Sequence, residues 1–309
     1  DRNQLDVVMV RRMKDELKLR WDGSRRFAER VVKHLEVPYS DDDRAAHQAL
    51  QEYTALRLKN ATTDGERTAA EFVLKLLKKR LFSSPAAFQI TLAKHQATVG
   101  GRKAAAALRR EIEDFGDDYA DDELYELEAG EVMSSASQAL SPLSAAEQAL
   151  LRQLATYADH ASRGPDTKAR TLIDWLKATL RPGGQWNDAR VILFTEYRAT
   201  QKWLHDLLAR QGFAEEGRLA LIYGGMPSDQ REAIKAAFQA HPREAQVRIL
   251  LATDAASEGV NLQNHCSRLI HYEIPWNPNR MEQRNGRVDR HGQKADAVEI
   301  FHFVAQGFD

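Results

Sequence analysis

The sequence has few of the features that mark secreted, metal-binding or membrane-spanning proteins. It contains a single cysteine, Cys266, which excludes an internal disulfide and a cysteine-based zinc site and favours a reducing compartment. No apolar run approaches the roughly 18 residues that a membrane helix needs, and the first residues show no signal-peptide pattern. His265, His271, His291 and His302 share no ligand spacing and have no cysteine partners, so no metal site is predicted. These absences predict a cytoplasmic protein without membrane contact.

Two motifs of nucleotide chemistry are also absent. Nothing matches G-x-x-x-x-G-K-[ST], the loop whose backbone amides and lysine hold phosphates. No DEAH or DEGH sequence follows a strand-like stretch, where its carboxylates would hold Mg²⁺ and orient water. The chain on its own is therefore predicted to be inactive as a nucleotide hydrolase.

The remaining bulk properties describe an ordinary folded protein. The length of 309 residues favours about two domains, and 43% hydrophobic with 29% charged residues excludes a disordered chain. A net charge of −1 argues neither for nor against nucleic acid, because a basic groove can be balanced elsewhere. The first residues, DRNQLDVVMVRR, begin abruptly and suggest a fragment of a longer protein.

Residues 39–163 are predicted to form a helical insertion or protrusion. The acidic residues 41–43 are candidate caps, and apolar residues follow them at helical spacing. Ser84, followed by a proline, gives a second helix start, and Ser144 with Glu147 forms a capping-box pattern. Few β-branched runs interrupt this region.

An acidic tract spans residues 111–131, EIEDFGDDYADDELYELEAGE, without one basic residue. Such a tract is most often a solvated or disordered loop. The alternatives are a contact with a partner or an autoinhibitory mimic of nucleic acid.

Residues 164–309, after Gly164-Pro165, alternate between helix and strand. The predicted strands are VILFTEY (191–197), LALIYGG (219–225), VRILLAT (247–253), RLIHYEI (268–274) and VEIFHFV (298–304). Alternating units at this spacing predict a parallel sheet covered by helices on both faces. Since ligands collect at the carboxyl ends of such strands, the polar turns there predict one working edge.

Motifs in this region resemble those of superfamily 2 helicases and translocases. Residues 252–263, ATDAASEGVNLQ, resemble motif V, and residues 283–293, QRNGRVDRHGQ, resemble motif VI. The preceding PWNPNRMEQ is most similar to the Swi/Snf-type branch in its bacterial RapA-like form. Residues 8–17, VMVRRMKDEL, resemble the element that joins the two motor lobes, although a solvated basic helix would look alike. The resemblance implies a RecA-like second lobe at 164–309 and, at 1–38, a connection from a missing first lobe.

The resemblance also assigns nucleic-acid contacts. Thr195 begins a match to motif IV, the glycine turn at Gly224 and Gly225 would approach the nucleic-acid backbone, and Thr253 would contact a phosphate. Glycine suits such a turn because it permits close approach and positive φ. Alternatively the glycines form only a turn, and Asp254 with its neighbours only caps a helix.

The nucleotide side of the site is assigned in the same way. Arg287 and Arg290 are implied to be arginine fingers, while Glu258, Gly259 and Gln283 would face the nucleotide. A guanidinium fork suits phosphate better than lysine does. The alternative is an ordinary surface cluster of arginines.

Other residues near motif VI allow more than one interpretation. Arg284 is a candidate to pair with Asp289 or Glu282, and Asn285 stands where the family usually has an apolar residue, which leaves the local packing open. Trp276 is interpreted as a hydrophobic plug that closes the domain; alternatively it contacts the nucleic-acid track, as Arg280 is predicted to do.

The resemblance implies the C-terminal half of an ATP-dependent translocase or remodeller. ATP and Mg²⁺ would be held mainly by the first RecA-like lobe. The track would be double-stranded nucleic acid, with DNA favoured over RNA. Bacterial members remodel RNA polymerase complexes or serve in phage defence, and the helical insertion would bind such a protein cargo. The alternatives are a non-catalytic DNA- or partner-docking module and the lobe of a strand-separating helicase.

Overall fold

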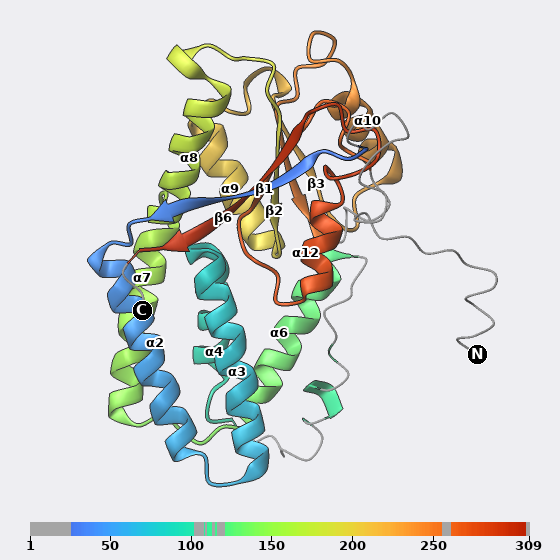
Figure 1. Ribbon diagram of the computed structural model, residues 1–309. Coiled ribbons are helices and arrows are strands. Elements are labelled where there is room, and N and C mark those ends of the chain that lie inside the picture. The colour runs from blue at the N-terminus through green and yellow to red at the C-terminus, as the bar shows by residue number, and fades with distance from the viewer. Residues whose placement is uncertain are drawn as a thin grey trace, which may run out of the picture.

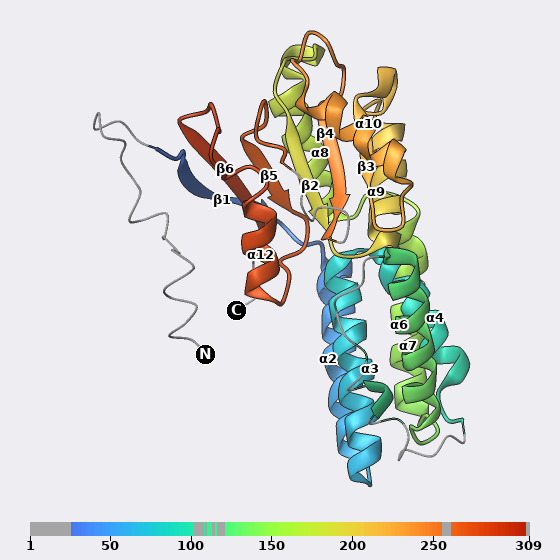
Figure 2. The same cartoon turned by 90° about the vertical axis from the view of Figure 1, so that its right-hand side faces the viewer.

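The structure is a computed structural model that describes residues 26–101, 108, 110–112, 115, 121–254 and 261–306. A parallel six-stranded sheet with helices on both faces forms one end, and a bundle of helices projects from it (Figure 1, Figure 2). The predicted class, a parallel α/β sheet preceded by a largely helical region, is confirmed. Among the described helices, none combines the length and apolar character needed to cross a membrane.

All strands of the sheet run parallel, in the order β1-β6-β5-β2-β4-β3. They are β1 (Glu29–Val37), β2 (Val191–Thr195), β3 (Leu219–Ile222), β4 (Ile249–Thr253), β5 (Arg268–His271) and β6 (Ala297–Ala305). Strands β2 to β6 coincide with the predicted ones. Parallel pairing requires a crossover between strands, and these crossovers bring the carboxyl end of every strand to the same edge.

Strand β1 lies in the segment that the sequence assigns to a connection from another lobe. It pairs with β6 along its whole length. Its position at the sheet edge leaves only Leu35 and Val37 buried, so the segment lacks the continuous apolar run of a central strand. The connecting segment therefore contributes a strand to this sheet, which the sequence did not reveal.

The two faces of the sheet carry separate apolar cores. Helices α8 (Thr167–Leu180) and α9 (Arg198–Arg210) pack on the face that contains Val191 and Leu193 of β2. Helix α10 (Ser228–Gln239) contributes Phe238 to the opposite face, which contains Ile192 and Phe194. This alternation follows from the period of two in a strand. Each fully buried leucine or isoleucine stabilises the fold by roughly 1.5–3 kcal/mol.

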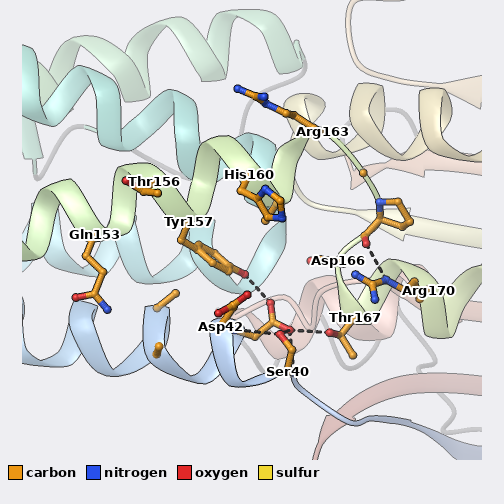
Figure 3. A pocket seen from close by; sticks show the side chains of 16 residues that line it. Ser40, Asp42, Gln153, Thr156, Tyr157, His160, Arg163, Asp166, Thr167 and Arg170 are labelled. Atoms are coloured by element: carbon orange, nitrogen blue, oxygen red, sulfur yellow. Dashed lines mark hydrogen bonds between the residues drawn. The ribbon is translucent and has the colours of Figure 1, made fainter.

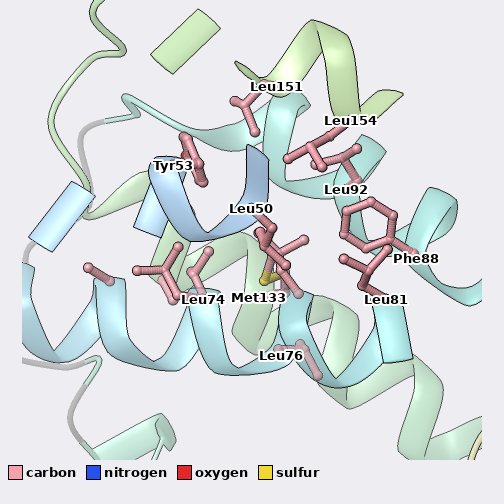
Figure 4. Packing of buried hydrophobic residues seen from close by; sticks show 14 of the residues in the cluster. Leu50, Tyr53, Leu74, Leu76, Leu81, Phe88, Leu92, Met133, Leu151 and Leu154 are labelled. Carbon is pink, nitrogen blue, oxygen red and sulfur yellow. The ribbon is translucent and has the colours of Figure 1, made fainter. Parts of the chain in front are cut away.

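The projecting bundle has a core of its own (Figure 4). Its helices are α2 (Asp41–Asn60), α3 (Asp64–Ser83), α4 (Pro85–Thr98), α6 (Asp122–Gln138) and α7 (Ala145–Ser162). Ser84 caps α4 and the capping box of Ser144 with Glu147 starts α7, as predicted. The prediction that residues 41–43 cap α2 is wrong, because Ser40 is the cap and the acids occupy the first turn, where they favour the helix dipole.

Inside this bundle His95 is completely buried, and Tyr53 and Ser137 lie within 2.6 and 2.7 Å of its two ring nitrogens. Burial lowers the pKa of His95 from its ordinary 6.5 to about 4, with the charge of Arg57 as a smaller cause. Between pH 6.5 and about 4, His95 therefore binds a proton in the unfolded chain but not in the folded chain. Stability from the neutral ring is fully present above pH 6.5 and falls as the pH drops towards 4.

We expect the His95→Gln variant to lose this pH dependence. The difference in free energy of unfolding between the two proteins should narrow by about 1.4 kcal/mol for each pH unit below 6.5, measured by urea unfolding. A difference that stays constant between pH 7 and pH 5 would contradict a neutral, buried His95.

Candidate functional site

The predicted nucleic-acid residues gather at the carboxyl edge of the sheet. Thr195 ends β2 and Thr253 ends β4, and the two residues are paired in the register of these strands. Gly224 and Gly225 follow β3, which is the neighbour of β4. We refer to Gly224, Gly225 and Thr253 together as the glycine–threonine edge.

Two donors of the glycine–threonine edge converge on one carboxylate oxygen. The backbone N–H of Gly224 and the hydroxyl of Thr253 both donate to Oδ2 of Asp122, each at 2.6 Å. Asp122 is 8% exposed and begins α6 of the bundle. Burial raises the pKa of Asp122, and the two hydrogen bonds and the positive charge of Arg198 oppose that rise. The edge therefore binds an oxyanion with short hydrogen bonds of the kind that ionised acceptors form.

The neighbouring Asp121 explains the second glycine. Asp121 caps α6 by accepting hydrogen bonds from the backbone N–H groups of Glu123 and Leu124. Gly225 has a φ of +82°, and a Cβ at this position would lie 2.5 Å from Oδ2 of Asp121. Any side chain here would meet both backbone strain and a carboxylate. Gly225 thus permits the close approach of a carboxylate of this chain, while its predicted approach to a nucleic-acid backbone stays a prediction.

Thr195 lies deeper than a surface contact requires. Its side chain is fully buried, and its hydroxyl has no hydrogen-bond partner among the described residues. Contact of Thr195 with nucleic acid stays a prediction, and it requires the groups that cover this edge to move.

Arg284 of α12 (Pro278–Asn285) joins motif VI to motif V. Its Nη2 donates to Asp254 Oδ2 at 2.6 Å, its Nε donates to Oδ1, and its Nη1 donates to the carbonyl oxygen of Glu273 at 2.9 Å. The guanidinium is completely buried. The hypothesis that Arg284 pairs with Asp289 or Glu282 is therefore wrong, because α12 points this side chain inward to the end of β4.

The two carboxylates of that hypothesis bind a different arginine. Arg30 of β1 lies 2.7 Å from Asp289 Oδ2 through Nη2 and 2.8 Å from Glu282 Oε1 through Nη1. The edge strand thereby fixes the outer side of motif VI.

Three further hydrogen bonds hold motifs V and VI together. The N–H of Leu262 donates to the carbonyl oxygen of Arg287 at 3.2 Å, and Gln263 Nε2 donates to that of His291 at 3.2 Å. Arg290 donates to the side-chain oxygen of Asn261. Arg287 is half-buried and Arg290 is exposed. Both predicted finger arginines thus lie in a segment that hydrogen-bonds to residues 261–263.

The other predicted contacts lie nearby or outside the described residues. Arg280 is one helical turn before Arg284, and its Nη1 lies 4.0 Å from Asp254 Oδ2. Gln283 is exposed on α12. Glu258 and Gly259 lie outside the described residues, as does the lobe-joining element predicted at 8–17.

Asn285, the departure from the family pattern, has a partner inside the lobe. Its Oδ1 lies 2.8 Å from Nε2 of His271, which ends β5. Burial lowers the pKa of His271 to about 3, so the ring is neutral and donates this hydrogen bond. The His302 ring stacks on it at a centroid distance of 4.9 Å. A polar residue at position 285 is thus matched by a buried histidine.

The interpretation of Trp276 as a plug is wrong. Its side chain is 61% exposed, and Ile274 beside it is 53% exposed. Both line a pocket of about 290 Å³ with Lys79 and Glu196, and Lys79 Nζ lies 5.9 Å from the centre of the indole ring. The loop between β5 and α12 carries Trp276 outward instead of folding it into the core.

A larger cavity of about 1060 Å³ lies where α2, α7 and the start of α8 meet (Figure 3). Asp43 in its wall accepts hydrogen bonds from Tyr157 Oη at 2.8 Å and from Thr167 Oγ1 at 2.6 Å. Burial raises the pKa of the nearby Asp166 to about 6. None of the predicted site residues lines this cavity, and its hydrogen bonds tie the bundle to α8.

Sequence reasoning missed two residues at the carboxyl edge. Asp254 is predicted from the sequence only as a helix cap. Asp122 is not singled out within the acidic tract, which is interpreted as a solvated loop or, alternatively, as a partner contact or a mimic of nucleic acid. The signal for Asp122 is present in the sequence, since Asp121 followed by DEL is a helix-start pattern that orders this end of the acidic tract. No local pattern shows that it meets residues about a hundred positions away.

Comparison with known proteins locates one family in the chain. Residues 168–292 match the family model described as helicase conserved C-terminal domain. The Bacillus subtilis protein named uncharacterized ATP-dependent helicase YqhH is 36% identical over 46% of this chain and 22% of its own length. The RNA polymerase-associated protein RapA of Proteus mirabilis is 33% identical over 40% of this chain and 12% of its own length. The chain therefore spans less than a quarter of either relative.

Among solved structures, the helicase domain of Hef from Pyrococcus furiosus is similar over 91% of this chain and 56% of that chain. The TM-score is 0.53 and the sequence identity 15%. This likeness concerns the fold alone.

Proposed function

We propose that this chain, whose residues 168–292 match the helicase conserved C-terminal domain, is the C-terminal half of an ATP-dependent translocase of the Swi/Snf type in superfamily 2. In this proposal a first RecA-like lobe of the same protein holds ATP and Mg²⁺. The chain supplies arginines to the nucleotide and backbone contacts to double-stranded nucleic acid, more specifically DNA.

The observation that carries this proposal is the junction of motifs V and VI. The buried pair of Arg284 with Asp254, together with the hydrogen bonds from Leu262 and Gln263, fixes the segment that bears Arg287 and Arg290. Because Asp254 follows the last residue of β4, a movement of this strand end would also move Arg287 and Arg290. The predicted nucleic-acid contact, Thr253, lies at the same strand end. The junction therefore provides a physical link between the nucleotide and the track.

The described residues include arginines that can donate to a triphosphate, but they do not include a loop that would hold it. When bound, ATP with Mg²⁺ supplies a γ-phosphoryl group whose transfer to water builds negative charge on its oxygens. Arg287 and Arg290 carry the donor forks that such oxygens accept. The sequence lacks the phosphate-binding loop, so these residues stabilise charge on a nucleotide held elsewhere.

The glycine–threonine edge fits a nucleic-acid phosphate. The Gly224 N–H and the Thr253 hydroxyl already converge on one oxyanion oxygen, and Gly225 lets a backbone approach closely. These donors recognise phosphate and not bases, so binding should show little sequence preference. Opening and closing of the two lobes would then move these contacts along one strand.

Arg280 gives a first test of the predicted track. We expect Arg280→Gln to weaken binding of duplex DNA alike for all sequences and to lower the slope of log affinity against log salt by about 1. Fluorescence anisotropy with a labelled duplex at several salt concentrations measures that slope. Arg67→Gln is the matched control, because Arg67 is an exposed arginine on α3 of the bundle. Equal slopes for both variants would remove Arg280 from the track.

The projecting bundle is the proposed site for a protein cargo. It carries exposed apolar side chains on α4 and α6, namely Ile90, Leu124 and Leu127. RapA, a relative, is named for its association with RNA polymerase. The match to the family model covers residues 168–292, so the bundle is not part of that domain.

A further inference from the structure

The bundle covers the edge at which the proposed function places nucleic acid. In both views α6 runs from the bundle up to the carboxyl ends of the strands (Figure 1, Figure 2). In the first turn of α6, the Asp122 carboxylate accepts hydrogen bonds from the Gly224 N–H and the Thr253 hydroxyl. An oxyanion of this chain thus stands at the donors that would meet a phosphate.

The surroundings of Asp122 suit a larger anion than a carboxylate. Arg198, at the start of α9, is 8% exposed, and its guanidinium lies 3.6 Å from the centre of the Tyr223 ring. Its buried Nε has no hydrogen-bond partner among the described residues, and neither does the hydroxyl of Thr195. Unsatisfied buried polar groups are costly. A phosphate group, with more oxygens than Asp122 provides, has the capacity to satisfy them.

The remaining contacts between the bundle and the lobe are mostly polar. Arg80 Nη1 lies 2.8 Å from Glu126 Oε1, and its guanidinium stacks 3.8 Å from the centre of the Tyr197 ring. At the surface, Lys202 Nζ lies 3.5 Å from Glu123 Oε1. The exposed Lys202 pair contributes little, about 0–1 kcal/mol, and is screened by salt, whereas Arg80 is 2% exposed and its pair is partly buried.

The bundle and the lobe also have separate apolar cores. The cluster around Tyr53, Leu77 and Phe88 contains only bundle residues, and the clusters on the sheet faces draw their buried members from β1 and the lobe. Polar interfaces between parts with their own cores are those at which relative movement is the default expectation. The bundle can therefore move relative to the edge while the buried members of each core stay together, at the cost of the Ala86 contact with the lobe and the hydrogen bonds of Ser83 and Ser84 to Thr200.

We propose that the first turn of α6 is an autoinhibitory phosphate mimic, in which Asp122 competes with a nucleic-acid phosphate for Gly224 and Thr253. This inference rests on the proposed function and adds its regulation. In the closed state the track is blocked, and nucleic acid binds only when α6 withdraws. A partner that holds the bundle away from the lobe would activate binding, which connects the cargo site to the track.

The test is duplex binding by the 309-residue chain and its Asp122→Asn and Asp122→Ala variants. We expect both variants to bind a fluorescein-labelled duplex at low salt about tenfold or more tightly than the unsubstituted chain. Only open molecules bind the duplex, so the apparent affinity of the unsubstituted chain is its intrinsic affinity multiplied by the fraction of molecules that are open. Asp122→Asn preserves the shape of the side chain, and circular dichroism with thermal unfolding confirms that each variant is folded.

Glu131→Gln is the control for net charge, since Glu131 is exposed on the same helix and the substitution removes one negative charge as well. Its affinity should stay close to that of the unsubstituted chain. If Glu131→Gln tightens binding as much as the Asp122 variants do, the effect is general electrostatics and the mimic is refuted. Unchanged binding by folded Asp122 variants refutes it as well.

A further variant separates this inference from the proposed function. Thr253→Val removes the hydroxyl and keeps the shape, and in an Asp122→Ala background it should weaken duplex binding. If Thr253→Val weakens binding of the chain but the Asp122 variants bind no tighter, the edge contacts DNA and the autoinhibition is wrong. If neither Thr253 nor Asp122 affects binding, both the inference and the proposed track fail.

Discussion

In the protein that carries both lobes, Arg287→Ala is expected to lower the ATP turnover by about 10³- to 10⁵-fold, the contribution of an arginine finger. Affinity for duplex DNA should change by no more than a few fold. The reason is the separation of the two roles, since Arg287 lies in the junction of motifs V and VI while the proposed phosphate donors lie at Gly224 and Thr253. Steady-state ATP hydrolysis and duplex binding, measured on the same preparations, test this prediction.

Two further variants serve as an intermediate case and as a control for the effect of Arg287→Ala. Arg287→Lys keeps the charge but loses the planar fork, so its turnover should lie between those of the unsubstituted protein and the alanine variant. Arg243→Ala removes an exposed arginine from the turn after α10 and should leave turnover unchanged. A protein with Arg287→Ala that still hydrolyses ATP but no longer binds duplex would refute the finger assignment.

The second large effect is on stability. Arg284→Ala should lower the free energy of unfolding by about 3–5 kcal/mol, because it removes the completely buried guanidinium that pairs with the Asp254 carboxylate. Loss of the hydrogen bond to the Glu273 carbonyl adds to this cost. Urea unfolding of the 309-residue chain gives the value.

The half-exposed pair of Arg268 with Glu299, at 2.8 Å, provides a matched control. Arg268→Ala should cost only about 0–1 kcal/mol, as exposed ion pairs do. The double variant Arg284→Met with Asp254→Leu should recover much of the lost stability, because apolar residues of similar size replace a buried pair at little cost. An Arg284→Ala variant as stable as Arg268→Ala would contradict a buried, structural Arg284.

The sequence predicts the elements of the sheet well where burial leaves a clear pattern. Central strands such as 191–195 and 249–253 are buried on both faces, so they appear as continuous apolar runs followed by polar turns. β1 escaped prediction because an edge strand needs few apolar residues, and only Leu35 and Val37 are buried.

The contacts within the candidate site are harder to predict from the sequence, because residues far apart in the chain form them. Local candidates for Arg284 lie within a helical turn or two, yet its partner is Asp254, thirty residues away. The contact of Asp122 with Thr253 spans 131 residues, and only the packing of the bundle on the sheet creates it. Asn285 contradicts its family pattern in isolation, and His271 on another strand makes it consistent. Motifs thus identify candidate residues, while the partners of these residues are determined by tertiary structure.

The central claim is that this chain is one half of a DNA-dependent ATPase. ATP hydrolysis by the 309-residue chain, alone and joined to its first lobe, with and without duplex DNA, tests it most directly. We predict no turnover by the chain alone and DNA-stimulated turnover once the first lobe is present. No turnover in either case would favour a non-catalytic docking module, and turnover by the isolated chain would show that the nucleotide binds in a place other than the one proposed.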